Sequence, residues 1–236
     1  MAGSTVAQSR RIRGVDSSEA ALVKAFRLGL ARSPLRSDAS RRTILQFYEF
    51  DGLSGRADVV VARVPARLRR RPAHSVLSNK TACRLVLALE RSRTPLSAND
   101  LAVRLGLSAP TVRRWLAELR RTKVVVYNAG RFTVRWDTTR LPAVDLWSFE
   151  AKLTNWQRAL YQATRYKAYS SKVFVVMPTN RARAAMKHID RFRRANVGLI
   201  TVDESCKIQI KRMPRREPPY SPSLYRMATA LIAQTL

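Results

Sequence analysis

The spacing of apolar residues along the chain alternates between the periods of a helix and of a strand. Apolar residues recur every three to four positions, as on one face of a helix, at 16–32 and 153–169, and a very basic third helix is predicted at 180–196. Runs rich in β-branched and aromatic residues predict strands at 43–50, 57–62, 145–151, 172–177 and 197–202. This order predicts an α/β fold.

The middle of the chain has a different pattern, in which three short helices precede two strands. The helices are predicted at 81–92, 99–105 and 108–121, and the strands at 124–127 and 131–136. Ser97 and Asp100 form a capping-box pattern at the start of the second helix, and Gly106 permits a tight turn before the third. This segment resembles the winged helix-turn-helix family of DNA-binding domains.

Two proline-containing stretches predict linkers. Residues 63–72 hold five arginines, two prolines and no acid, so this linker can also contact phosphates. Residues 213–222 hold four prolines and precede a predicted terminal helix at 223–236 that docks on the body of the protein. Residues 1–15 carry arginines and no acid, which favours a disordered basic arm over an organelle transit peptide.

The charge balance indicates an anionic partner. The chain has 45 Lys and Arg against 16 Asp and Glu, a net charge of +29. Such an excess favours nucleic acid, with an anionic membrane surface as the weaker alternative. Two cysteines exclude a disulfide-rich scaffold, and no CxxC pair or long apolar run is present. We therefore expect a cytoplasmic, nucleoid-associated protein with DNA as its partner, no membrane contact and, lacking a glycine-rich phosphate loop, no nucleotide cofactor.

The third helix of the winged segment is predicted to read DNA. Its start directs backbone N–H groups outward, and its polar face carries threonine and arginines, as in a helix that lies in the major groove. An arginine after the hairpin turn can reach the minor groove or a phosphate. The predicted DNA-binding residues are Ser108, Thr111, Arg113, Arg114, Arg120 and Arg131. A protein-binding module with a solvated arginine face is the alternative.

Two acids lie in otherwise apolar strands on either side of this segment. Asp58 begins the strand ADVVVA, and Glu150 and Lys152, two positions apart, lie on one face of the strand DLWSFEAK. A buried carboxylate is costly unless it is paired or binds metal. We therefore predict that Asp58 and Glu150 bind Mg²⁺ or Mn²⁺. Lys152 is predicted to orient an attacking water and to lower its pKa. The alternative is a Glu150–Lys152 ion pair on the surface of an edge strand.

This arrangement resembles the PD-(D/E)XK nuclease superfamily, whose members hold a metal with an acid on one strand and E-x-K on the next. Glu19, on the first helix, resembles an acid that many members carry there. Gln162 and Tyr166 resemble the Q-x-x-x-Y of exonuclease-V-type members; the resemblance implies that Gln162 positions the phosphate or metal-bound water and that Tyr166 supports it. Ala57 stands where the motif has proline. Asp58 and Glu150 are far apart in the sequence because the winged segment lies between them. The resemblance therefore requires this segment to be an insertion between the two strands.

The resemblance implies a restriction-endonuclease-like core, with a mixed central sheet flanked by helices, that is interrupted by a winged helix-turn-helix. The predicted parts are the arm 1–15, half-cores 16–72 and 140–212, the winged domain 76–138, and the linker and terminal helix 213–236. The expected function is metal-dependent hydrolysis of DNA phosphodiesters, with a homodimer as one way to cut both strands. The alternative is a DNA-binding regulator or architectural protein with a catalytically silent core. An RNA-processing nuclease is less favoured because no aromatic stacking platform is evident.

Overall fold

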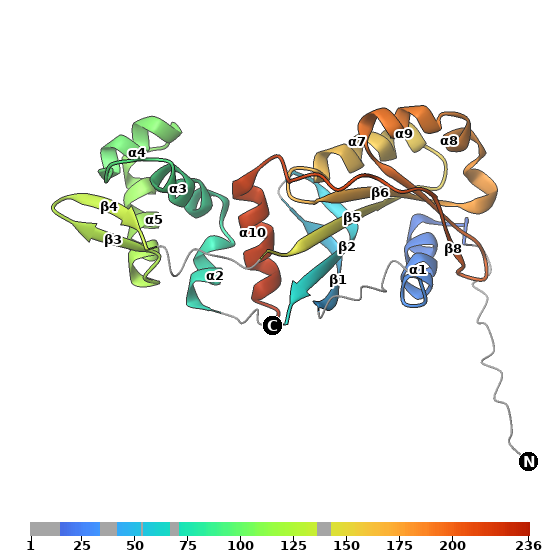
Figure 1. The fold of residues 1–236 in the computed structure, drawn as a ribbon, viewed down its shortest axis with the longest axis horizontal. Helices are drawn as coiled ribbons and strands as arrows, with labels where there is room; N and C mark the ends of the chain where they lie inside the picture. The colour runs from blue at the N-terminus through green and yellow to red at the C-terminus, as the bar shows by residue number, and fades with distance from the viewer. Residues whose placement is uncertain (1–14, 34–41, 53, 67–70, 136–142) are drawn as a thin grey trace, which may run out of the picture.

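A computed structural model describes residues 15–33, 42–52, 54–66, 71–135 and 143–236 of the chain. The described residues form a six-stranded sheet with helices on both faces and a smaller helical unit with a two-stranded sheet. Figure 1 shows the smaller unit (green) at one end of the molecule and the large sheet with its helices at the other. The predicted basic arm, apart from Val15, lies outside the described residues.

The large sheet joins the two halves of the chain that flank the winged segment. Its strand order is β1-β2-β5-β6-β7-β8. Strands β1 and β2 form an antiparallel hairpin, β2 pairs antiparallel with β5, and β5, β6 and β7 run parallel before an antiparallel β8. The bounds are Arg42–Asp51, Arg56–Pro65, Asp145–Ala151, Lys172–Pro178, Gly198–Val202 and Ile208–Arg212. The mixed sheet with flanking helices confirms the coarse fold prediction.

Each face of the sheet buries a separate core, because side chains alternate along the strands. Helix α1 (Glu19–Leu30) covers one face, where Phe26 packs against Phe149 with ring centroids 5.0 Å apart. Helix α7 (Trp156–Tyr166) and helix α9 (Ile189–Ala195) cover the other face. Ser18 caps α1 by accepting a hydrogen bond from the Ala21 N–H. Strand β5 is therefore buried on both faces.

The smaller unit has the predicted winged helix-turn-helix order. Its parts are α3 (Lys80–Glu90), α4 (Ala98–Leu105), α5 (Ala109–Arg121), β3 (Val125–Asn128) and β4 (Arg131–Val134). The capping box joins Ser97 and Asp100, with hydrogen bonds of 3.1 and 2.8 Å. Gly106 ends α4 with φ of 62°, a left-handed conformation that glycine adopts without strain.

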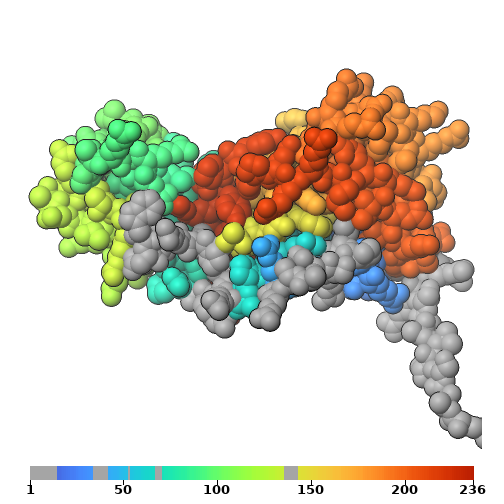
Figure 2. Space-filling view, viewed as in Figure 1, coloured from blue at the N-terminus to red at the C-terminus, as the bar shows by residue number. Residues whose placement is uncertain are grey.

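The C-terminal helix α10 (Pro222–Ala233) lies between the two units, as Figure 1 shows. The Arg226 guanidinium donates to both carboxylate oxygens of Glu90 on α3, at 2.9 and 2.8 Å. The Tyr225 hydroxyl accepts from the Val144 N–H and donates to the Val144 carbonyl. In Figure 2 the red C-terminal segment borders the green winged unit on one side and the orange core helices on the other. This agrees with the predicted docking of the terminal helix.

Several elements differ from the sequence prediction. The predicted linker at 63–72 is shorter, since β2 continues to Pro65 and helix α2 (Pro72–Leu77) begins at Pro72. The basic helix at 180–196 is divided at His188, which ends α8 (Arg183–Lys187) and stacks on Trp156 at 5.0 Å. Strand β8 was not predicted, and Val15 is buried in the core beside α1. No helix in the described ranges combines the length and apolar character needed to cross a membrane.

Candidate active site and DNA-binding unit

Asp58 and Glu150 lie side by side although the winged unit separates them along the chain. In the antiparallel pairing of β2 with β5, Val59 is opposite Phe149, so the next step of the ladder brings Asp58 opposite Glu150. The Asp58 carboxylate accepts a hydrogen bond from the Ala151 N–H at 2.7 Å. Burial raises the pKa of Asp58, although this hydrogen bond opposes the shift. The sheet thus assembles the two predicted metal ligands.

Glu150 is the most deeply buried acid of this group, with 2% of its surface exposed. Its Oε2 accepts a hydrogen bond from the Tyr166 hydroxyl at 2.5 Å, and its Oε1 lies 3.5 Å from the Lys152 ammonium. Burial, reinforced by the charge of Asp58, raises the pKa of Glu150 to about 7. Strand β5 lies between β2 and β6, so the alternative of a surface ion pair on an edge strand is wrong.

Lys152 follows the end of β5 and links it to helix α1. Its ammonium donates to the Glu19 carboxylate at 2.7 Å. Burial alone would lower the pKa of Lys152, but the hydrogen bond to Glu19 and the charges of Glu150, Glu19 and Asp58 outweigh it and raise the pKa. Lys152 is therefore a cation at neutral pH, which suits it to stabilise negative charge rather than to accept a proton.

Helix α7 carries the two remaining candidate residues, one helical turn apart. The Tyr166 hydroxyl lies 2.7 Å from the Arg56 carbonyl oxygen as well as beside Glu150, so it joins the start of β2 to β5. The Gln162 amide oxygen is buried and has no hydrogen-bond partner among the described residues. A buried, unsatisfied acceptor is costly in a folded protein.

The donor set fits a hard divalent cation. The carboxylates of Asp58 and Glu150 are the oxygen donors that Mg²⁺ and Mn²⁺ prefer. Burial raises the pKa of each acid, and the charge of a bound cation would favour the ionised forms. The described residues contain no group of three or more His, Cys, Asp or Glu side chains that could hold a metal ion.

A fourth acid, Glu49, was missed in the sequence. In the β1–β2 hairpin, Tyr48 pairs with Val59 and Phe50 pairs with Ala57. Glu49 lies between these two pairs, at the level of Asp58. It forms an ion pair with Arg56 at 2.6 Å, and its charge contributes to the raised pKa of Asp58. Only the hairpin register, which the sequence pattern does not fix, brings Glu49 to this level.

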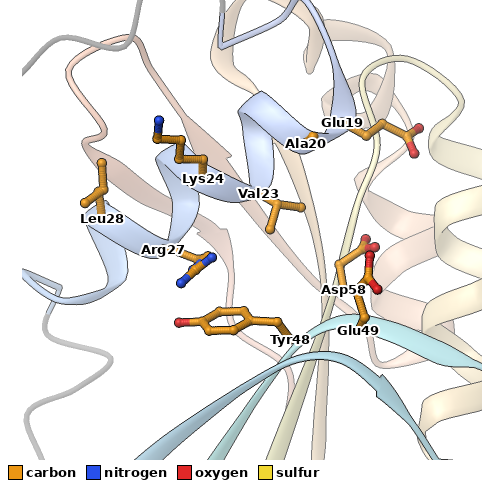
Figure 3. Close-up of a pocket in the computed structure, with 9 residues that line it drawn as sticks. All are labelled: Glu19, Ala20, Val23, Lys24, Arg27, Leu28, Tyr48, Glu49 and Asp58. Atoms are coloured by element: carbon orange, nitrogen blue, oxygen red, sulfur yellow. The ribbon is translucent and has the colours of Figure 1, made fainter.

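The candidate site opens into a cleft of about 790 Å³ between α1 and the β1–β2 hairpin. Figure 3 shows the carboxylates of Glu19, Glu49 and Asp58 toward one end of the cleft. The other end carries Lys24, Leu28 and Arg27, whose guanidinium lies over the Tyr48 ring. Asp145, another acid of β5, lies at the opposite end of that strand, where it accepts hydrogen bonds from Ser171, Trp147 and Arg216.

The predicted reading helix α5 presents its arginines to solvent. Arg113, Arg114 and Arg120 are exposed, and Arg120 lies 5.3 Å from the ring of Tyr127 in the wing. Ser108 caps the helix, and its hydroxyl lies 2.8 Å from that of Thr111. The Arg131 guanidinium donates to the Pro95 carbonyl and lies 3.8 Å from Asp100. This arginine is partly engaged within the domain, and DNA contact by all six residues stays a prediction.

A protein-family model for the IclR helix-turn-helix domain matches residues 82–129, from within α3 to just beyond β3. A DNA-binding helix-turn-helix domain is therefore present in this chain. Neither the curated proteins nor the solved structures include a match to the chain. The resemblance of the core to the PD-(D/E)XK nucleases gains no support from these comparisons.

Proposed function

We propose that this protein binds DNA through its winged unit and hydrolyses DNA phosphodiester bonds at the site formed by β2, β5, α1 and α7. One observation carries the proposal: Asp58 and Glu150 lie on adjacent paired strands with the Lys152 ammonium 3.5 Å from Glu150. A buried acid and a half-buried acid, both of raised pKa and beside a cation, are costly to fold, and such sites are more often functional than structural.

Each side chain has a distinct part in this proposal. Asp58 and Glu150 would hold Mg²⁺ or Mn²⁺, which when bound supplies Lewis acidity and lowers the pKa of a bound water. Lys152 stabilises negative charge on the phosphate, and Glu19 holds its ammonium in place at 2.7 Å. Tyr166 fixes the Glu150 carboxylate, and Gln162 offers a free acceptor for a water or the cation.

The winged unit would direct this chemistry to DNA. Helix α5 carries Arg113 and Arg114 on its exposed face, as expected for a helix in the major groove. The net charge of +29 adds attraction to phosphate along the rest of the surface. A homodimer that cuts both strands, and a nucleoid-associated location, belong to the same proposal.

A second candidate function is regulation of transcription. The family match favours it over the nuclease, because the IclR family consists of transcriptional regulators. The match covers only residues 82–129 and does not reach the strands that carry Asp58 and Glu150. In this case the acids would belong to a catalytically silent core, and the protein would bind a discrete operator without cutting it.

Cleavage of supercoiled plasmid in Mg²⁺ or Mn²⁺ separates the two functions. The hydrolase proposal expects nicked or linear product from the native protein and none from Glu150→Gln or Lys152→Met, with plasmid binding retained. Glu204→Gln and Lys187→Ala change exposed residues of the same types on other elements and should leave cleavage intact. Absence of product with either metal, together with tight binding to one sequence, would favour the regulator.

A further inference from the structure

The cleft beside the candidate site has an end that the proposed hydrolysis does not use. Glu19 and Asp58 line one part of it, while Lys24, Arg27 and Tyr48 line another. Lys24 and Arg27 come from one exposed side of α1, and Tyr48 from the neighbouring strand β1. Neither cation forms an ion pair with a described residue, so their charge is available to an anionic ligand.

The Arg27 guanidinium lies over the ring of Tyr48 in this part of the cleft. The guanidinium carbon lies 3.5 Å from the centroid of the Tyr48 ring, and 40% of the tyrosine is exposed. Stacked arginine and aromatic side chains are surfaces on which unpaired nucleobases stack, because every base has a flat π-face. A paired base inside a duplex does not expose that face. The Arg27–Tyr48 stack is thus an aromatic platform beside the acids, which the sequence pattern did not reveal.

The volume of the cleft limits what can enter it. Its 790 Å³ lies within the range of about 300–1,000 Å³ typical of pockets that enclose small molecules. A nucleotide or two fits such a space. Because the same chain carries a DNA-binding helix-turn-helix domain, the expected occupant is a strand of DNA.

Resting on the hydrolase proposed above, we infer that this cleft binds unpaired nucleotides of the DNA strand that reaches Asp58 and Glu150. The base stacks on the Arg27–Tyr48 pair, and Lys24 contacts the adjoining phosphate. The substrate class is therefore DNA with a single-stranded segment, such as a tail, a flap or a frayed end, joined to a duplex that the winged unit holds. Intact blunt duplex binds only through the winged unit and the basic surface.

Binding measured in EDTA, where no cleavage occurs, tests the cleft directly. The probes are a blunt duplex and the same duplex with a single-stranded tail that carries 2-aminopurine, whose fluorescence falls when it stacks. The native protein should bind the tailed probe more tightly and quench it. Tyr48→Ala should remove the quenching and weaken tailed binding about tenfold, with blunt binding unchanged.

Three further variants separate stacking from charge and from misfolding. Tyr48→Phe keeps the ring and should bind as the native protein does. Arg27→Lys keeps the charge but loses the plane and should behave like Tyr48→Ala. Tyr220→Ala removes another exposed tyrosine that neighbours a cation, Lys167, outside the cleft, and should change nothing. Equal affinity for both probes, or a tail preference that survives Tyr48→Ala, overturns the inference.

Cleavage of the same probes in Mg²⁺ or Mn²⁺ distinguishes failure of the inference from failure of the proposed function. Tail-selective binding that depends on Tyr48, without any cleavage, contradicts the hydrolase and supports the cleft. Cleavage of blunt duplex that equals cleavage of the tailed probe, and is unaffected by Tyr48→Ala, supports the hydrolase and overturns the cleft.

Discussion

The hydroxyl of Tyr166 lies 2.5 Å from Oε2 of Glu150 and 2.7 Å from the carbonyl oxygen of Arg56. A phenol has one proton, so it donates to only one of these acceptors at a time. When Glu150 is ionised, Tyr166 donates to it; when Glu150 is protonated, Glu150 donates to Tyr166 and Tyr166 donates to Arg56. Glu150 thus keeps a hydrogen bond in both of its ionisation states. The free energy of unfolding depends on which of the two states is populated at a given pH.

The first prediction concerns the pH dependence of folding. The pKa of Glu150 rises from 4.5 to about 7 on folding, chiefly through burial. Between these values the folded state holds a proton that the unfolded state has lost, so the free energy of unfolding falls as pH rises and levels off above about 7. The contribution is roughly 3 kcal/mol. Urea unfolding at pH 5 and pH 8 should show this loss in the native protein and a smaller loss in Glu150→Gln. Equal losses in the two proteins would contradict the assignment.

The second prediction concerns divalent metal. A cation held by Asp58 and Glu150 binds their ionised forms, so Mn²⁺ or Mg²⁺ should raise the melting temperature more at pH 8 than at pH 5.5. Asp58→Asn should abolish the shift. Asp190→Asn alters an exposed acid paired with Arg193 on α9 and should retain it. An equal shift in both variants would indicate that the metal binds elsewhere.

The third prediction concerns the reading helix. Double substitution of Arg113 and Arg114 by alanine should weaken binding to duplex DNA. If both contact phosphates, the dependence of log affinity on log salt concentration should become shallower by about two. Arg121→Ala removes an arginine of the same helix whose charge is already paired with Glu118 at 2.7 Å, so its effect should be smaller. An unchanged salt slope in the double variant would exclude α5 as the phosphate-contacting helix.

The fourth prediction concerns the contact between α10 and the winged unit. The Arg226–Glu90 pair is largely buried, and removal of one partner leaves the other charge unpaired. Arg226→Met should lower the free energy of unfolding by about 3 kcal/mol. The double variant Arg226→Met with Glu90→Leu should recover much of that loss. A double-mutant cycle measures the coupling, and strictly additive losses would show that the pair does not hold α10 in place.

The sequence predicted the parts of the fold that depend on local patterns. Ser18, Ser97 and Ser108 cap helices because their side chains bond to the first backbone N–H groups of the same helices. The proximity of β2 and β5 was also predicted, because Asp58 and Glu150 were expected to bind the same metal ion. Their juxtaposition is a property of the structure, whereas the chemistry assigned to them stays a proposal.

Features that depend on distant partners could not be predicted in the same way. Strand β8 alternates Ile208 and Ile210 with polar residues and forms only because β7 offers an edge. The break at His188 reflects its stacking on Trp156 of α7. The Arg27–Tyr48 stack joins a helix and a strand whose approach is set by the core between them. Each of these depends on which surfaces meet, and no short stretch of sequence encodes that.

The insertion of the winged unit between β2 and β5 has a consequence for how such a protein can be altered. The two strands that flank it pair with each other, so the sheet closes beneath the insertion, while α10 packs against α2 and α3 of the inserted segment. Another recognition module grafted between Pro65 and Asp145 would therefore also have to cover this side of α10. Such a chimera would need a carboxylate in the place of Glu90, since Arg226 would otherwise be left as a buried orphan charge.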